Sequence, residues 1–302
     1  MNGIIYIEEQ GMRDGLQTLS IPINLELRLK WIDILISSGI KRLQIGSFVH
    51  PKLVPMMADT DRLFLELRGR NYGGVLFSAL VLNTKGVERA IDCGVEHLSI
   101  SLSASDTHSM KNAGKDVERS KVQLVEMIKL ARSHKIKVRS GIQCAFGCRY
   151  EGSISKNKVL ELADFILDQG VDEISLADST GMGHPLQVEE LVSAVKERCR
   201  DKMIGLHLHN TENKGYANIY AGIRAGANII DTAFGGLGGC PFIKGATGNV
   251  ATEDVVHMLE QMGIATGVDI EKVKEVSLEV ENIVGNPLPG LMYKLNFKQV
   301  SN

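Results

Sequence analysis

The sequence predicts a (β/α)8 barrel, the TIM-barrel fold of the α/β class, followed by a short C-terminal helical extension. Eight apolar, β-branched segments recur along the 302 residues, each followed by a polar turn and a helical pattern. Their starts are about 32 residues apart, close to the roughly 30 residues of a βαβ unit. No linker interrupts the series, whereas a doubly wound sheet usually has fewer strands and a switch point.

The expected strands are short and evenly spaced. They cover Gly3–Glu8, Arg42–Phe48, Gly74–Leu82, His97–Ser103, Lys137–Phe146, Glu173–Asp178, Ile204–Asn210 and Ile229–Phe234. The segments between them carry apolar residues at spacings near 3.6, which indicates helices with one buried face. Two such stripes consist of Leu25, Leu29, Ile32 and Leu35, and of Val122, Val125, Ile128 and Ala131.

We expect a single domain over residues 1–302, with the barrel over about 1–265 and the extension over about 266–302. An extra helix is expected to run through Ile283, and the tail after it contains Pro287 and Pro289. Proline cannot continue a helix, so the chain should leave helical structure there. This extension could cover the barrel or pack on a partner.

Composition excludes several classes of partner. With 34 basic and 36 acidic residues, the net charge is −2, and no basic block offers a footprint for nucleic acid or an anionic membrane. The longest mostly uncharged apolar stretch, Gly74–Leu82, is far shorter than the roughly 20 residues of a membrane-spanning helix. Five cysteines are too few for a disulfide scaffold, and a strand begins almost at Met1. These features predict a cytoplasmic protein.

A barrel of this kind places its chemistry at the C-terminal ends of the strands, and the seventh predicted strand carries two histidines there. Strand alternation sends His207 and His209 to one face and the neighbouring leucines to the other. Two adjacent imidazoles can bind a metal ion. The alternative is a pair of hydrogen-bonded core histidines, which the spacing alone favours.

The turn after the first strand contains Arg13 and Asp14, followed by Gly15. From spacing alone, a turn with a surface ion pair is the favoured interpretation. At a barrel mouth, however, the carboxylate could complete a site of two histidines and one carboxylate, while the guanidinium binds an oxyanion.

The segment after the eighth strand, residues 235–249, holds six glycines in fifteen residues. It is predicted to be a flexible lid or to let the backbone approach a ligand closely. A helix N-terminus at Thr252 makes phosphate binding a competing interpretation. Cys240 lies between Gly239 and Pro241 and not on an apolar face, which favours a reactive thiol.

Two weaker candidates lie at the ends of the fifth and sixth strands. Asp178 could orient a ligand or an arginine, or it could cap the turn that follows. Cys144 and Cys148 lack the partners expected of a zinc site, and we predict that they do not form one.

Four motifs together resemble the 3-hydroxy-3-methylglutaryl-CoA (HMG-CoA) lyase family of metallolyase barrels. They are Arg13-Asp14-Gly15-Leu16-Gln17; Ser47-Phe48 with Pro51-Lys52 and Val54-Pro55; His207 with His209; and Gly235–Pro241 with Gly248–Asp254. The resemblance runs from the first strand to about residue 270. The motifs occur in the family's order, each at a predicted barrel mouth, which argues against chance.

The resemblance implies a retro-Claisen cleavage of HMG-CoA, or of a related 3-hydroxyacyl-CoA, to acetyl-CoA and a 3-oxo acid such as acetoacetate. It implies that Mg²⁺ or Mn²⁺ is bound by Asp14, His207, His209 and the side-chain carbonyl of Asn249. The implied catalytic positions are those of Arg13, Cys240, His207 and Gln44. Supporting contacts are expected from Asp178, Ser47 and Asn83, and a homodimer is expected.

The chain departs from the family pattern at four positions. Gln44 stands where the family has a glutamate, and an amide keeps a hydrogen bond but carries no negative charge. The other departures are Asn210 for an aspartate, Met12 for a proline and His184 for a small residue. These changes suggest a different 3-hydroxyacyl-CoA substrate or a slow enzyme.

Two alternatives to the lyase follow from the same residues. A condensing synthase of the metallolyase group would use the same Arg-Asp-Gly and His-x-His elements, but such proteins generally carry accessory C-terminal domains. Cys240 on its glycine-rich segment also favours the lyase. A catalytically weak homologue that binds an acyl-CoA or a partner protein for regulation is the second alternative, and Gln44 is its motivation.

Overall fold

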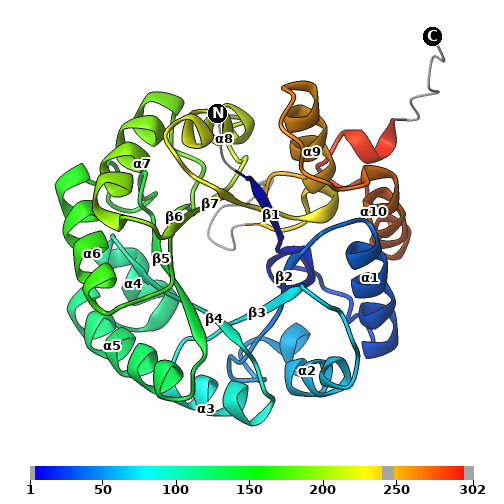
Figure 1. The fold of residues 1–302 in the computed structure, drawn as a ribbon, viewed down its shortest axis with the longest axis horizontal. Coiled ribbons are helices and arrows are strands. Elements are labelled where there is room, and N and C mark those ends of the chain that lie inside the picture. Colours follow the sequence, from blue (N-terminus) through cyan, green and yellow to red (C-terminus); the bar gives the residue numbers. More distant parts are fainter. Residues whose placement is uncertain (1–3, 240–247, 296–302) are drawn as a thin grey trace.

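The computed structural model describes residues 4–239 and 248–295, and over these residues the core is a closed barrel of eight parallel strands (Figure 1). The strands are β1 (Tyr6–Glu9), β2 (Arg42–Ser47), β3 (Leu76–Leu80), β4 (His97–Ser103), β5 (Lys137–Gln143), β6 (Glu173–Asp178), β7 (Met203–Leu208) and β8 (Ile229–Thr232). β1 closes the barrel by pairing in parallel with both β2 and β8. The predicted fold class is confirmed.

Helices form the outer layer around these strands (Figure 1). They are α1 (Leu25–Ser37), α2 (Thr60–Arg68), α3 (Thr84–Asp92), α4 (Asp106–Ala113), α5 (Val117–Ser133), α6 (Lys156–Asp168), α7 (Pro185–Cys199), α8 (Gly215–Arg224), α9 (Thr252–Gln261) and α10 (Ile270–Val284). Many begin at a side chain that accepts a backbone N–H of the first turn, such as Asn24 before α1 and Ser155 before α6. None of the described helices is long and apolar enough to cross a membrane.

The predicted elements differ from the observed ones mainly at their ends. β5 stops at Gln143, three residues before the predicted end, because Cys144 has a φ of 55° and leaves the extended conformation. In α5 the predicted stripe is wrong at Val122, which is 63% exposed. The helix instead buries Leu124, Met127, Ile128 and Ala131.

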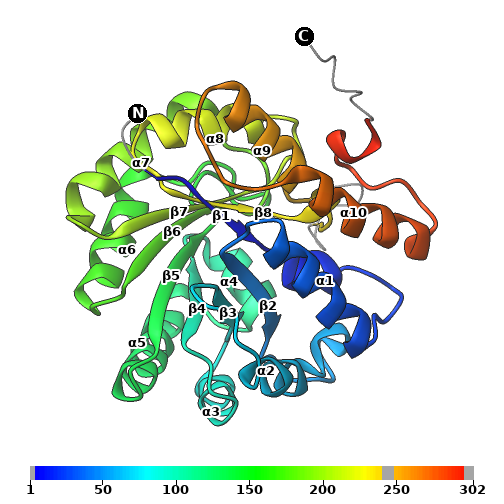
Figure 2. The ribbon, with the colours of Figure 1, turned by 45° about the vertical axis from the view of Figure 1, so that its right-hand side comes forward.

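The predicted extra helix is α10, which lies beside α1 on the outside of the barrel (Figure 2). Glu279 of α10 accepts hydrogen bonds from Lys30 and from the Trp31 indole of α1. Beyond α10 the chain returns to the barrel, where the Gly290 N–H donates to the Gly235 carbonyl at 2.7 Å. The described part of the extension therefore covers the barrel where β8 ends.

A buried carboxylate stabilises the seam between β1 and β8. One oxygen of Glu9 accepts the backbone N–H groups of Gly11 at 2.6 Å and Phe234 at 3.0 Å. The other oxygen accepts the Thr252 hydroxyl at 2.5 Å, so one side chain joins β1, the segment after β8 and α9. Burial raises the pKa of Glu9 to about 8, although all three donors oppose the shift.

The Glu9→Gln variant is expected to gain stability relative to the wild type as the pH rises. Between the ordinary pKa of 4.5 and about 8, the unfolded chain releases a proton that native Glu9 retains. The contribution of Glu9 to the free energy of unfolding therefore falls by roughly 1 kcal/mol per pH unit over this window, relative to a variant without this carboxyl group. Glutamine keeps the contacts, because its carbonyl can accept both N–H groups and the Thr252 hydroxyl can turn to accept from its amide.

Urea denaturation of both proteins at about pH 5 and about pH 8 measures this difference. A stability difference that stays the same at both pH values would show that native Glu9 ionises as an ordinary carboxyl group.

Candidate active site

The two histidines at the end of β7 lie together at the barrel mouth. Their Nε2 atoms are 3.3 Å apart. Leu206 and Leu208 are buried on the opposite face, and Leu206 packs so closely on α8 that a Cβ at Gly222 would lie 2.2 Å from it. The alternation predicted for this strand is therefore observed, with imidazoles on the barrel side and leucines under the helices.

The turn after β1 brings a carboxylate to this histidine pair. The Gln10 carbonyl accepts the N–H groups of Arg13, Asp14 and Gly15, which folds residues Gly11–Gly15 into a tight helical turn. The ligand atoms of Asp14 and the two histidines then lie within 4.8 Å of one another, and no other set of three potential ligands in the described ranges does so. The predicted ion pair between Arg13 and Asp14 forms, but it is not a surface pair, because the Asp14 side chain is only 17% exposed.

Asn249 joins the group from the far end of the glycine-rich segment. Its backbone bridges to His209, and the Asn210 N–H donates to the Gly248 carbonyl at 2.8 Å. Its amide nitrogen donates to Asp14 Oδ2 at 2.8 Å, which leaves the buried Oδ1 atom without a hydrogen-bond partner. Glycine is required at Gly238, where φ is 139° and a Cβ would lie 2.5 Å from the Asn249 amide nitrogen.

The electrostatic surroundings of these groups favour the protonation states in which they can bind a metal ion. Burial opposes ionisation of Asp14, but Arg13 and the two histidines outweigh it and hold the pKa of this carboxyl well below its ordinary value. Burial, together with His207, lowers the pKa of His209 to about 4. An ionised carboxylate, a neutral imidazole and an unpartnered amide oxygen form a donor set that fits a divalent cation.

Arg13 is oriented by two amides and the carboxylate. Its Nε donates to Gln44 Oε1 at 2.5 Å, its Nη2 donates to Gln10 Oε1 at 3.3 Å, and its Nη1 pairs with Asp14. Among the residues that the structure describes, the guanidinium therefore has Asp14 as its one ion-pair partner, which is also a candidate metal ligand. Sequence reasoning missed Gln10, although an amide at the end of a buried strand, three residues before Arg13, was a signal.

Two of the remaining predicted residues, Asp178 and Asn83, hold local turns with their side chains. Asp178 accepts the N–H groups of Met182 and Gly183, which is the turn-capping alternative, and burial raises its pKa. Asn83 caps α3 by accepting the Gly86 N–H. The Ser47 hydroxyl is buried at the end of β2 without a hydrogen-bond partner. A contact of these side chains with substrate stays a prediction, and Cys240 lies outside the described residues.

Of the four departures from the family pattern, Gln44 is the one that contacts Arg13. Asn210 accepts the Gly215 N–H at the start of α8, and His184 caps α7. Met12 is fully buried in the core. The side chains of Asn210 and His184 therefore hold local turns, and an effect of these two departures on the substrate stays a prediction.

The competing phosphate interpretation is not supported by the start of α9. Glu253 is buried there and accepts the Gly235 N–H at 2.9 Å. Asp254 accepts the N–H groups of Leu291 and Met292. Two carboxylates thus lie at this helix N-terminus, where a phosphate would be repelled.

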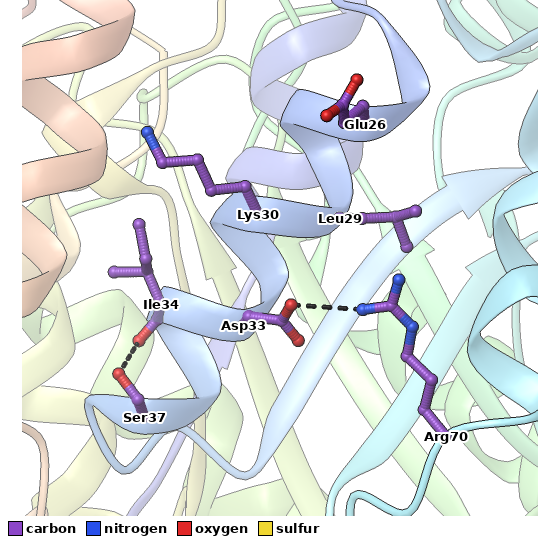
Figure 3. Close-up of a pocket in the computed structure, with 7 residues that line it drawn as sticks. All are labelled: Glu26, Leu29, Lys30, Asp33, Ile34, Ser37 and Arg70. Atoms are coloured by element: carbon purple, nitrogen blue, oxygen red, sulfur yellow. Dashed lines mark hydrogen bonds and ion pairs between the residues drawn. The ribbon is translucent and has the colours of Figure 1, made fainter.

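A surface pocket lies outside the barrel, on the outer face of α1 (Figure 3). Asp33 of α1 and Arg70 form an exposed ion pair in it, with an N–O distance of 3.2 Å. The pocket is lined by Glu26, Leu29, Lys30, Asp33, Ile34, Ser37 and Arg70. None of these is a predicted site residue, so the candidate chemistry belongs to the barrel mouth.

Fold and site together define a (β/α)8 barrel with a potential metal-binding group of two histidines and one carboxylate at its mouth. The HMGL-like family model matches residues 4–280. The chain therefore belongs to the HMGL-like family. The hydroxymethylglutaryl-CoA lyase of Bacillus subtilis is 36% identical over 285 residues, which cover 94% of this chain and 95% of the relative.

Two further proteins extend this comparison. The (R)-citramalyl-CoA lyase of Chloroflexus aurantiacus is 37% identical over 96% of this chain and 94% of its own length. The solved structure of an HMG-CoA lyase from Acinetobacter baumannii in complex with coenzyme A and 3-methylmalate superposes with a TM-score of 0.93 at 32% identity, covering 100% of this chain and 99% of that one. The predictions of the family and of a carbon–carbon lyase are confirmed.

Proposed function

We propose that the protein is a divalent-metal-dependent lyase that cleaves HMG-CoA, or a related 3-hydroxyacyl-CoA, to acetyl-CoA and a 3-oxo acid such as acetoacetate. The observation that carries this proposal is the convergence of Asp14, His207 and His209 beside Arg13 at the barrel mouth. The substrate class is supported by the names of the relatives and by the coenzyme A complex of the Acinetobacter baumannii enzyme.

The proposed cofactor is Mg²⁺ or Mn²⁺. Asp14, His207 and His209 would hold it together with the unpartnered Oδ1 atom of Asn249, because mixed oxygen and imidazole ligands suit these ions. Bound there, the ion supplies a Lewis acid that makes a substrate hydroxyl easier to deprotonate.

The side chains around this site would then assist a retro-Claisen cleavage. A base removes the proton of the C3 hydroxyl, and the C2–C3 bond breaks as the oxygen forms a carbonyl group. The released electron pair forms the enolate of the acetyl thioester. Arg13 is suited to stabilise the enolate oxygen, because its guanidinium is permanently charged and already oriented by Gln44 and Gln10. Protonation of the enolate carbon yields acetyl-CoA, and the role proposed for Cys240 is to help donate this proton or to organise the acid that does.

Within this reaction class, the substrate could carry one of several acyl groups, and Gln44 bears on which one. Gln44 leaves the Arg13 guanidinium with less negative charge around it than a glutamate would, so a more anionic acyl group than that of HMG-CoA could bind. The similarity to a citramalyl-CoA lyase supports testing citramalyl-CoA as well, whose single carboxylate lies one carbon closer to the hydroxyl-bearing carbon than that of HMG-CoA.

The direct test is incubation with a panel of 3-hydroxyacyl-CoA thioesters and Mg²⁺ or Mn²⁺, with products identified by mass. We expect acetyl-CoA and one 3-oxo acid, and no products from a His207→Ala/His209→Ala variant. Consumption of acyl-CoA with a 2-oxo acid, without cleavage, would instead identify a condensing synthase. Tight binding of Mn²⁺ and acyl-CoA without turnover at high enzyme concentration would identify a binding protein.

Removal of the metal is expected to stop the reaction. A chelator should lower turnover by at least about 100-fold, because the developing charge on oxygen loses its Lewis acid. Added Mn²⁺ or Mg²⁺ should restore it. Chelator already saturated with Mg²⁺ serves as the control, and turnover that persists after exhaustive metal removal would contradict metal dependence.

The Gln44→Glu variant is expected to raise turnover of HMG-CoA by about 10-fold, because a carboxylate at 2.5 Å from Arg13 Nε supplies the missing charge and can accept a proton. Gln10→Glu is the matched control, since it adds the same charge beside the same guanidinium through a longer contact of 3.3 Å. Steady-state kinetics compare the two variants. If turnover falls or stays unchanged in Gln44→Glu, Gln44 is an adaptation to a different substrate.

Oligomeric state and location stay predictions. The family resemblance implies a homodimer, which light scattering after size-exclusion chromatography measures directly. The four cysteines in the described part of the chain are free thiols, which agrees with the reducing, cytoplasmic compartment predicted from the sequence.

A further inference from the structure

The second ring nitrogen of His207 has a buried carboxylate as its neighbour. Nδ1 of His207 lies 3.2 Å from Oδ2 of Asp231 on β8, while Nε2 faces the ring of His209. Asp231 is only 5% exposed. The two strands pair in register at these residues, so both side chains project to the same side of the sheet.

The position of Asp231 is itself fixed by a buried arginine, Arg139. Nη1 of Arg139 on β5 donates to the other carboxylate oxygen, Oδ1, at 2.8 Å. The Arg139 side chain is 2% exposed and also pairs with Glu8 at 3.1 Å. Gly205, two residues before His207 on the same face of β7, makes room for the guanidinium, because a Cβ there would lie 2.2 Å from Arg139 Nη2.

This arrangement determines which nitrogen of His207 can carry the hydrogen. A carboxylate paired with an arginine only accepts hydrogen bonds, so the nitrogen that faces it must be the donor. The neutral imidazole that binds a metal then has its hydrogen on Nδ1 and its lone pair on Nε2. Nε2 is the atom that faces the second histidine and the candidate metal site.

We propose that Asp231, held by Arg139, is a positioning residue that fixes His207 as the Nδ1–H tautomer and so presents its Nε2 lone pair to the divalent ion. This inference rests on the proposed metal site. The proposal gives the buried charges of Arg139 on β5 and Asp231 on β8 a role in metal affinity, in addition to their role in the packing of the barrel.

The same network offers a matched control at its other end. Glu8 also pairs with Arg42 at 2.8 Å, and Arg42 pairs with Glu173 at 2.6 Å. Glu173 is as buried as Asp231 and is also bound to an arginine, but it has no contact with His207 among the described hydrogen bonds. Loss of either carboxylate removes one buried charge, and only the loss of Asp231 removes the acceptor for His207.

The first experiment measures Mn²⁺ affinity by titration calorimetry in the wild type, Asp231→Asn and Glu173→Gln. The amide introduced by Asp231→Asn has one acceptor oxygen and cannot serve both His207 and Arg139, so we expect Mn²⁺ to bind roughly 10- to 100-fold more weakly. Glu173→Gln should bind within about 2-fold of the wild type. Unchanged affinity in Asp231→Asn, or an equal loss in Glu173→Gln, would overturn the proposal.

The second experiment needs no destabilised variant. Nitrogen NMR of metal-free protein with ¹⁵N-labelled histidine reports the tautomer of His207, with His207→Gln used to assign its signals. The Nδ1–H tautomer is expected. A His207 ring that carries its hydrogen on Nε2 would overturn the proposal, even if Asp231→Asn does not fold.

The outcomes separate this inference from the proposed function. A wild-type protein that binds no Mn²⁺ would contradict the metal site itself, and the role of Asp231 with it. A wild type that binds Mn²⁺, together with an Asp231→Asn variant that binds it equally well, would leave the metal-dependent lyase in place and reject only the positioning role.

Discussion

The rest of the site depends on the close approach of two imidazoles and one carboxylate at the barrel mouth. His207 and His209 direct their Nε2 atoms at one another across 3.3 Å, where two lone pairs would repel without a shared hydrogen or cation. Asp14 adds an ionised carboxylate within 4.8 Å of both ligand atoms. A divalent cation would satisfy all three groups at once, and this is the physical basis of the proposed metal dependence.

The contacts that close the barrel also build this site. Glu9 holds the turn that carries Asp14 and the backbone after β8. Glu253, whose pKa burial raises to about 7, holds Gly235 from the outer side and accepts the Ser277 hydroxyl of α10. The extension beyond α10 reaches the same segment through Leu288, which packs against Gly235. These contacts all lie where β1 meets β8. The same residues therefore stabilise the fold and determine the geometry of the candidate metal ligands.

The sequence predicted the features that depend on local pattern. Eight strands, the shared face of His207 and His209, and the mouth position of Asp14 all follow from periodicity and from barrel architecture. The contacts of Gln10, Arg139 and Asp231 depend on which residues of distant strands lie in register, and no local pattern contains that information. The same limit explains why the sequence did not predict that the side chains of His184 and Asn210 cap local turns.

Pulsed electron paramagnetic resonance of the protein with one equivalent of Mn²⁺ tests the central claim most directly. The account predicts nitrogen hyperfine coupling from directly bound imidazole, which a His207→Ala/His209→Ala variant should lose. A Mn²⁺ signal without nitrogen coupling, or coupling that survives in this variant, would contradict the assignment of the two histidines as metal ligands.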